Sequence, residues 1–410
     1  MARAVAVAAA AALFLSAAAA PGPSYTLKML SPTKHPDARC LDGSMGGYYV
    51  SDAPAKDPTK FLIHLQGGGW CVSLEDCASR AGGHYGSSRS WTSGACPDKN
   101  NMACWADNPT GVPAGLGGNA SESPLFADAV PIWVPYCDGA SFSGGGDSIQ
   151  FNSTLALHFR GRAILDAVLD ELVAAEGLAA ATAVLLKGCS AGGQAVYIHA
   201  DRVAARVAAV APSARFAAAP GAGLFLNVTA FGGAASFATI YKWIAATQNV
   251  SASLGAACTA ARAPGDAWQC FLAPVALGYV ATPLFISNSL VDSCAAGFVM
   301  GLACDARVPA GLPFACSAAQ LAYLSGYRAD MVAVVAPVLA ARPQHGAFLQ
   351  ACWTHIVEDD AVAWGVTRVA GQTQAETFAA WWRRDDSAAT VAVDGEWGSN
   401  PSCSNMGTCY

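Results

Sequence analysis

The most reactive arrangement in the sequence is a serine at the centre of Gly-Cys-Ser-Ala-Gly, residues 188–192. G-x-S-x-G is typical of a nucleophile elbow, a sharp turn between a strand and a helix that lifts the serine hydroxyl clear of a sheet. The context fits, because the apolar run 183–186 predicts a buried strand and valines at roughly helical spacing follow Gly193. We therefore expect Ser190 to act as a nucleophile, with the amides of the helix N-terminus facing an acyl oxygen that gains charge.

A serine nucleophile needs a base and an orienting acid, and this kind of elbow places them later in the chain in the order acid, then histidine. Asp292 follows the strand-like run 283–289, which is where the acid belongs, although an aspartate there can also simply cap the next turn. His345 and His355 both satisfy the order for the base. The rival acids are Asp305, Asp359 and Asp360, of which the last two lie close to His355 in sequence.

A second chemical loop, Gly67-Gly68-Gly69-Trp70, follows the apolar run 61–65. Glycines allow the backbone to approach a substrate closely, so this loop can donate N–H groups to an oxyanion; a flexible turn is the alternative. His64 lies inside the apolar run and precedes the elbow, so we interpret it as a core histidine.

The fifteen cysteines indicate a disulfide framework formed in an oxidising compartment. An odd number leaves one thiol over, and Cys189, next to the nucleophile, is the natural candidate; its thiol could instead be the nucleophile, but the elbow presents its third residue. Zinc ligation is the other common use of cysteines, but no C-x-x-C occurs.

Residues 1–20 combine one basic residue, Arg3, with an alanine-rich apolar run, which predicts a secretory signal peptide; a membrane anchor is the alternative. No later stretch is expected to cross a membrane. Secretion also agrees with the sequons, which predict N-glycans at Asn119, Asn152, Asn227 and Asn249.

The composition describes a large core with a sparsely charged surface, since 53% of residues are hydrophobic and 13% are charged. The net charge of −6, without a basic patch, makes nucleic acid an improbable partner. We expect one α/β domain over residues 21–410, with a disulfide-tied loop insertion at about 75–128 and a helical insertion at about 224–280.

The motifs HLQGGGWC, VPYCDGASFSG, KGCSAGG and ACWTH, in this order, resemble those of the plant-type pectin acetylesterases and their animal relatives, the Notum carboxylesterases. The resemblance implies an α/β-hydrolase fold with a mostly parallel central sheet, helices on both faces and disulfide-rich loops. It also implies a role for each site residue. These are Ser190 as nucleophile, Asp292 as orienting acid, His355 as general base, and Gly69, Trp70 and Ala191 as backbone donors to the oxyanion.

The chain departs from the family pattern at Gln66, where a glutamate is usual, and at 221–223, where plant members tend to have an Asp-containing turn. We expect a secreted, monomeric, cofactor-free and metal-free serine esterase that removes acetyl groups from a pectin-like polysaccharide outside the cell or in the cell wall. The alternatives are a Notum-like fatty-acyl esterase and an inactive binding protein on the same scaffold.

Overall fold

The computed structural model describes residues 24–95, 102, 115–233, 237–309, 311, 315–385 and 387–403. The predicted signal peptide therefore lies outside the described residues, as does much of the expected loop insertion.

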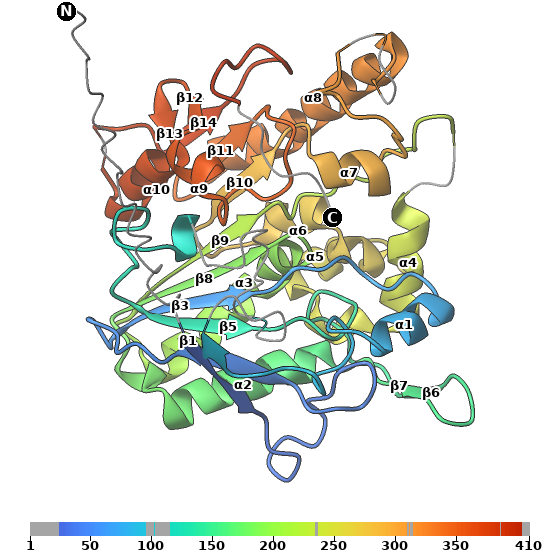
Figure 1. The fold of residues 1–410 in the computed structure, drawn as a ribbon, viewed down its shortest axis with the longest axis vertical. Helices are drawn as coiled ribbons and strands as arrows, with labels where there is room; N and C mark the ends of the chain where they lie inside the picture. The colour runs from blue at the N-terminus through green and yellow to red at the C-terminus, as the bar shows by residue number, and fades with distance from the viewer. Residues whose placement is uncertain are drawn as a thin grey trace, which may run out of the picture.

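A ten-stranded sheet forms the centre of the molecule (Figure 1). Its order is β14-β11-β10-β9-β8-β3-β5-β2-β1-β4, in which the strands from β14 to β5 are parallel and β2, β1 and β4 are antiparallel. The strands are β1 Ser24–Met29, β2 Gly47–Ser51, β3 Lys60–Leu65, β4 Gly94–Ala95, β5 Val130–Val134, β8 Ala183–Cys189, β9 Arg215–Gly221, β10 Phe285–Ser289, β11 Gly346–Gln350 and β14 Val391–Val393. Two short hairpins lie outside this sheet: β6 Ile149–Gln150 with β7 Ala156–Leu157, and β12 Arg368–Val369 with β13 Gln372–Thr373.

Helices cover both faces of the sheet, as expected for an α/β protein. The α-helices are α1 Leu74–Ala81, α2 Gly161–Ala175, α3 Ala191–Val210, α4 Phe237–Thr247, α5 Ala256–Ala260, α6 Ala273–Ala276, α7 Ser293–Phe298, α8 Ala318–Ala341, α9 Ala361–Gly365 and α10 Gln374–Arg383. The 3-10 helices are η1 Gly115–Gly117, η2 Leu178–Ala180, η3 Val250–Ser253, η4 Ala267–Phe271 and η5 Leu277–Tyr279.

The sheet separates two apolar cores. The larger core holds buried side chains from α2, α3, α6 and α8, whereas the smaller core holds those of α9 and α10. Strands between such layers are buried on both sides, which explains why β3 and β8 read as nearly continuous apolar runs. The carboxyl ends of the central parallel strands meet at one edge, on the right in Figure 1, where α1, α4 and α7 also lie. Loops at this edge are the ones that can share a site.

Two features differ from the sequence-based expectations. Residues 74–81 form α1, although the region from 75 to 128 was expected to be loop. Helix α8 is long and apolar enough to cross a membrane by length and composition alone. Its buried side chains are Leu324, Tyr327, Met331 and Val335, which pack into the larger core.

Disulfides agree with the predicted framework, and two of them, Cys40–Cys137 and Cys352–Cys403, join segments far apart in the chain. The bonds are Cys40–Cys137, Cys71–Cys77, Cys258–Cys270, Cys304–Cys316 and Cys352–Cys403, and Cys294 is also disulfide-bonded. Cys189 is buried and keeps its thiol, as expected.

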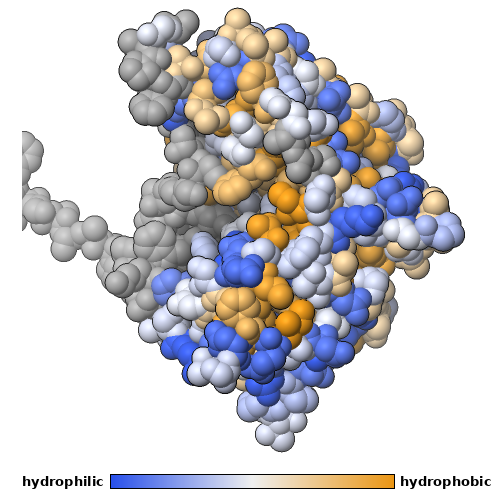
Figure 2. Space-filling view, turned by 90° about the vertical axis from the view of Figure 1, so that its right-hand side faces the viewer, coloured by the Kyte–Doolittle hydropathy of each residue, from blue (hydrophilic) through white to orange (hydrophobic). Residues whose placement is uncertain are grey.

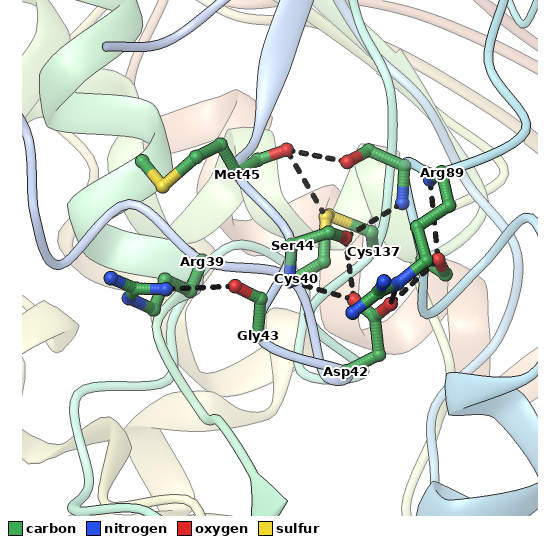
Figure 3. A network of polar contacts seen from close by, with 10 residues as sticks. Arg39, Cys40, Asp42, Gly43, Ser44, Met45, Arg89 and Cys137 are labelled. Atoms are coloured by element: carbon green, nitrogen blue, oxygen red, sulfur yellow. Dashed lines mark hydrogen bonds and ion pairs between the residues drawn. A yellow bond between two sulfur atoms is a disulfide. The ribbon is translucent and has the colours of Figure 1, made fainter. Parts of the chain in front are cut away.

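A polar network around Asp42 joins the N-terminal loop to the segment that follows α1 (Figure 3). The carboxylate accepts hydrogen bonds from the Ser44 backbone N–H at 2.9 Å, the Ser87 hydroxyl at 2.8 Å and Arg89 Nε at 2.7 Å. Burial alone would raise the pKa of Asp42, but the Ser44 hydroxyl, which also donates to this carboxylate, and the other donors together outweigh burial and lower the pKa below its ordinary value. The adjacent Cys40–Cys137 disulfide ties the same loop to the end of β5.

Asp42→Asn should lower the free energy of unfolding by about 1–3 kcal/mol at pH 7, because the amide cannot replace every acceptor contact of the carboxylate. A carboxyl whose folded pKa is depressed stabilises the protein above its unfolded pKa, and this stabilisation is lost as the pH falls through the folded value. The difference between wild type and variant should therefore shrink below about pH 4. Denaturant unfolding with intact disulfides, at several pH values, measures this difference in the free energy of unfolding. Asp37→Asn, at an exposed carboxylate, is the matched control. A difference that does not change with pH would contradict this account.

Candidate active site

Ser190 lies at the sharp turn between β8 and α3, as the elbow motif predicts. Its φ of 59° and ψ of −125° place a non-glycine residue in a region that costs energy, so the surrounding packing must enforce the turn. A Cβ on Gly192 would lie 2.0 Å from the Leu65 carbonyl oxygen, and one on Gly188 would lie 2.5 Å from the Gly192 oxygen. The glycines of the motif are therefore required by backbone contact, including contact with β3.

Asp292 has two roles, one for each carboxylate oxygen. Oδ1 caps α7 by accepting the backbone N–H groups of Cys294 and Ala295, both at 2.8 Å. Oδ2 lies 2.8 Å from Nδ1 of His355. Both side chains are buried, at 1% and 7% exposure, so water competes little for this contact. Since a carboxylate accepts, Nδ1 of His355 carries the proton and Nε2 is left as the basic nitrogen.

The loops after β10 and β11 are joined along their length. Leu290 N–H donates to the Gln350 carbonyl at 2.8 Å, the Ser289 hydroxyl donates to the Cys352 carbonyl at 2.6 Å, and Ser293 N–H donates to the Thr354 carbonyl at 3.2 Å. The Cys352–Cys403 disulfide further ties down the loop that carries His355. The Asp292–His355 contact is thus built on a fixed backbone.

Backbone contacts also connect the elbow to these loops through β9. Ser190 N–H donates to the Gly221 carbonyl at 3.0 Å, and Ala222 N–H donates to the Ser287 carbonyl at 2.8 Å. Ser190, Asp292 and His355 therefore lie at the carboxyl ends of β8, β10 and β11, all within four adjacent strands of the sheet.

The glycine-rich loop after β3 lies beside the elbow, because β3 and β8 are neighbours. Gly68 and Gly69 have φ values of 139° and 67°, which other residues adopt only with strain. The indole N–H of Trp70 donates to Ser141 Oγ at 2.8 Å. Ala191 is the first residue of α3, so its N–H has no intrahelical acceptor. These backbone groups suit the role of oxyanion donors.

The loop after β5, which contains Ser141, contacts the side chain of Trp70 and has a strained backbone. Ser141 and Phe142 both have positive φ, 52° and 55°, and the buried carboxylate of Asp138 holds them by accepting the N–H groups of Phe142 at 3.1 Å and Ala140 at 3.2 Å. Burial raises the pKa of Asp138 to about 6, although these donors act against the shift. The sequence singled out this motif without indicating that it positions Trp70.

Gln66 stands where a glutamate was expected from the family resemblance. The side chain is buried, and Oε1 accepts the N–H of Tyr136 at 3.1 Å. A glutamine therefore supplies the acceptor that this backbone needs and adds no buried charge.

The rival base His345 and the predicted core histidine His64 both make other contacts. His345 is buried and accepts the Leu284 N–H at its Nδ1, 3.1 Å away, and burial lowers its pKa to about 4. His64 is a core residue, as predicted, with its ring 4.0 Å from that of Trp133 and its pKa lowered by burial and by Lys187.

The rival acids Asp305, Asp359 and Asp360 each make a contact other than one with His355. Asp305 pairs with Arg307, and Asp360 caps α9. Asp359 forms a fully buried ion pair with Lys187, whose Nζ lies 5.6 Å from the Trp133 ring centroid. Burial raises the pKa of Asp359, and the lysine opposes that shift. The sequence carried a signal for this pair, because a lysine in the apolar run AVLLKGC must have a buried counter-charge.

Three groups of potential metal ligands occur among the described residues. They are Asp292 with Cys294 and His355, Cys352 with Asp394 and Cys403, and Cys189 with Glu358 and Asp359. The cysteines of the first two groups are in disulfides and cannot act as thiolates, and Asp359 of the third is paired with Lys187.

Comparisons with known proteins place the chain in a family. A family model described as Pectinacetylesterase matches residues 18–404. Pectin acetylesterase 11 of Arabidopsis thaliana is 29% identical over 90% of this chain and 90% of its own length, and Pectin acetylesterase 7 is 30% identical over 80% and 78%. Palmitoleoyl-protein carboxylesterase NOTUM of Schmidtea mediterranea is 28% identical over 62% of this chain and 46% of its own.

The structure of the Wnt deacylase Notum from Drosophila superposes with a TM-score of 0.76, at 21% identity, over 93% of this chain and 99% of that one. This likeness assigns the fold, which is that of an α/β-hydrolase, as predicted.

Lys187→Met should destabilise the protein by about 3–5 kcal/mol, because it leaves the Asp359 carboxylate in the core without its counter-charge. Adding Asp359→Leu should recover much of this loss, since the double variant buries no unbalanced charge from the pair. Thermal unfolding of the single and double variants provides the comparison. A double variant no more stable than Lys187→Met would show that the pair does not carry the effect.

Proposed function

Because the chain belongs to the pectinacetylesterase family and is thus related to carboxylic ester hydrolases, we propose that it is a secreted serine esterase. Its proposed substrate is an acetylated, pectin-like polysaccharide, from which it removes acetyl groups. The observation that carries this proposal is the 2.8 Å contact between Asp292 and His355 at the same sheet edge as the strained Ser190 turn.

The proposed reaction proceeds through an acyl-enzyme. His355 Nε2 takes the proton of the Ser190 hydroxyl as Oγ attacks the acetyl carbonyl carbon, and Asp292 stabilises the imidazolium that forms. The negative oxygen of the tetrahedral intermediate is held by the backbone N–H groups of Gly69, Trp70 and Ala191. His355 then protonates the leaving sugar oxygen as its bond to the acetyl carbon breaks, which releases the sugar hydroxyl. Water attacks the acetyl-serine as His355 takes its proton, and His355 returns that proton to Ser190 Oγ as acetate leaves.

Aromatic packing beside the site supports a short acyl group over a fatty one. The ring of Phe225 lies 4.9 Å from that of Trp70 and 6.1 Å from that of His355. Phe237 and Tyr241 also pack against Trp70, at 5.9 and 5.2 Å. Phe225, Phe237 and Tyr241 are at most 4% exposed, so these bulky rings are closely packed beside Trp70.

The surface features support action outside the cell. The sequon residues Asn119, Asn152, Asn227 and Asn249 are all exposed and therefore accessible to glycosylation. The disulfides agree with an oxidising compartment. Figure 2 looks onto the side of the molecule where the parallel strands end and shows hydrophobic and hydrophilic residues side by side.

Substitutions of Asp292 separate its two roles. Asp292→Asn should lower kcat by about 10⁴-fold, because an amide facing Nδ1 favours the wrong tautomer of His355. The side-chain oxygen should still cap α7, so thermal stability should change little. Asp292→Ala should be comparably inactive and, in addition, destabilised by about 1 kcal/mol through loss of the cap. Hydrolysis of 4-nitrophenyl acetate and thermal unfolding are the two readouts. An active Asp292→Asn variant would exclude the proposed triad.

The choice between acetyl and fatty-acyl substrates is tested by the chain length of nitrophenyl esters. The wild type should prefer acetate to octanoate. Phe225→Ala should raise the ratio of octanoate to acetate kcat/KM by about 10-fold or more, because it opens space next to Trp70. Phe298→Ala, at an exposed position on α7, is the control. A wild type that prefers octanoate would favour the lipid esterase instead.

A further inference from the structure

A small pocket lies between α10 and the segment that follows η1, and none of the residues proposed for catalysis lines it. Its volume is about 210 Å³, below the roughly 300–1,000 Å³ typical of sites for drug-sized ligands. Leu125, Trp364 and Phe378 contribute apolar walls, and Glu122 and Arg383 are among the charged residues that also line it. An apolar surface with a few polar groups suits one small ring that carries hydroxyl or amide groups.

One polar group of this pocket lacks a hydrogen bond within the described part of the chain. Ser123 lines the pocket and is 2% exposed, and its hydroxyl has no hydrogen-bonding partner among the described residues. A buried hydroxyl without a partner costs free energy, and a ligand that supplies a donor or an acceptor removes this cost. The pocket therefore offers a ligand a hydrogen bond as well as apolar contact.

The sequon at Asn119 is built onto the wall of the same pocket. The Asn119 carbonyl accepts the N–H groups of Glu122 at 3.0 Å and of Ser123 at 2.8 Å, so its backbone is fixed relative to two lining residues. Its Nδ2, the atom to which an N-glycan is attached, lies 3.2 Å from Oε1 of Glu122. A glycan on this exposed asparagine therefore starts beside a side chain of the pocket.

The other sequons differ in their surroundings. Asn152, Asn227 and Asn249 are exposed as well, but no residue of their sequons lines this pocket. A covalent tether holds a ligand near its site at an effective concentration in the millimolar range, so even a weak site is occupied. Only the glycan on Asn119 gains this advantage for the pocket beside α10.

We propose that the pocket holds the first N-acetylglucosamine of a glycan on Asn119, with the acetamido group hydrogen-bonded to the Ser123 hydroxyl and the apolar face of the sugar against Leu125. The glycan then joins the segment after η1 to α10. This inference does not depend on the proposed esterase function. It requires only that the chain passes through a secretory pathway that attaches N-glycans.

The test uses the full chain secreted from a eukaryotic host that attaches oligomannose glycans. An endoglycosidase that cuts between the two core N-acetylglucosamines is added, and mass spectrometry of glycopeptides follows its cleavage at Asn119 and Asn152. In the folded protein, cleavage at Asn119 should be about 3- to 10-fold slower than at Asn152, because the seated sugar shields the bond. In the unfolded protein the two rates should be equal.

Variants of the pocket identify the source of this protection. Ala379→Phe, on the α10 wall, should fill the pocket and speed cleavage at Asn119 by about the same 3- to 10-fold, with no change at Asn152. Ser123→Ala removes a hydroxyl that has no partner in the described protein, so it should fold normally and speed cleavage at Asn119 by a smaller factor. Ala322→Phe, at an exposed position of α8, is the matched control and should change neither rate.

Three results would overturn the inference. They are an Asn119 that stays unmodified in the secreted protein, equal cleavage at Asn119 and Asn152 in the folded wild type, and a protection of Asn119 that survives Ser123→Ala and, where it folds, Ala379→Phe. The last result would show that something other than this pocket shields the glycan.

Discussion

The candidate site depends on one carboxylate divided between two tasks. Oδ1 of Asp292 holds the first turn of α7, and Oδ2 holds the ring of His355. The helix fixes the direction in which the second oxygen points, so the orientation of the imidazole follows from the capping of a helix. Asp292 does cap a helix, as the alternative reading expected, and the same carboxylate also contacts His355.

The backbone around Ser190 is likewise fixed by a contact between two segments, the elbow and the end of β3. The elbow can form only where Gly192 meets the Leu65 carbonyl, so the turn and the end of β3 hold each other in place. The loop that follows β3 therefore starts from a fixed point, and Trp70 at its end is anchored again by Ser141. That second anchor uses positive φ values at Ser141 and Phe142, which the buried Asp138 stabilises. Close packing around both loops offsets the backbone strain at Ser190 and at Ser141 and Phe142.

Much of this arrangement follows from local sequence. The elbow motif predicts Ser190, and chain order restricts the base to His345 or His355; the structure puts His345 in the core, where it accepts from Leu284. The Lys187–Asp359 pair could not be located in the same way, because a lone lysine indicates a partner without saying which of many acids provides it. Helix α1 was missed although Ser73 and Asp76 form a recognisable N-terminal cap, since the polar composition of the segment resembled a loop. The contacts of Phe225 with Trp70 and His355 could not be located from the sequence, because the three residues lie far apart in the chain.

The central claim is that Ser190 is a nucleophile activated by His355. A fluorophosphonate probe followed by peptide mapping tests it most directly, because the probe forms a stable bond only with an activated serine. The account predicts that folded wild-type protein is labelled at Ser190, and that labelling is lost in Ser190→Ala and strongly slowed in His355→Ala. Folded wild-type protein that is not labelled, or is labelled at another residue, would contradict the account.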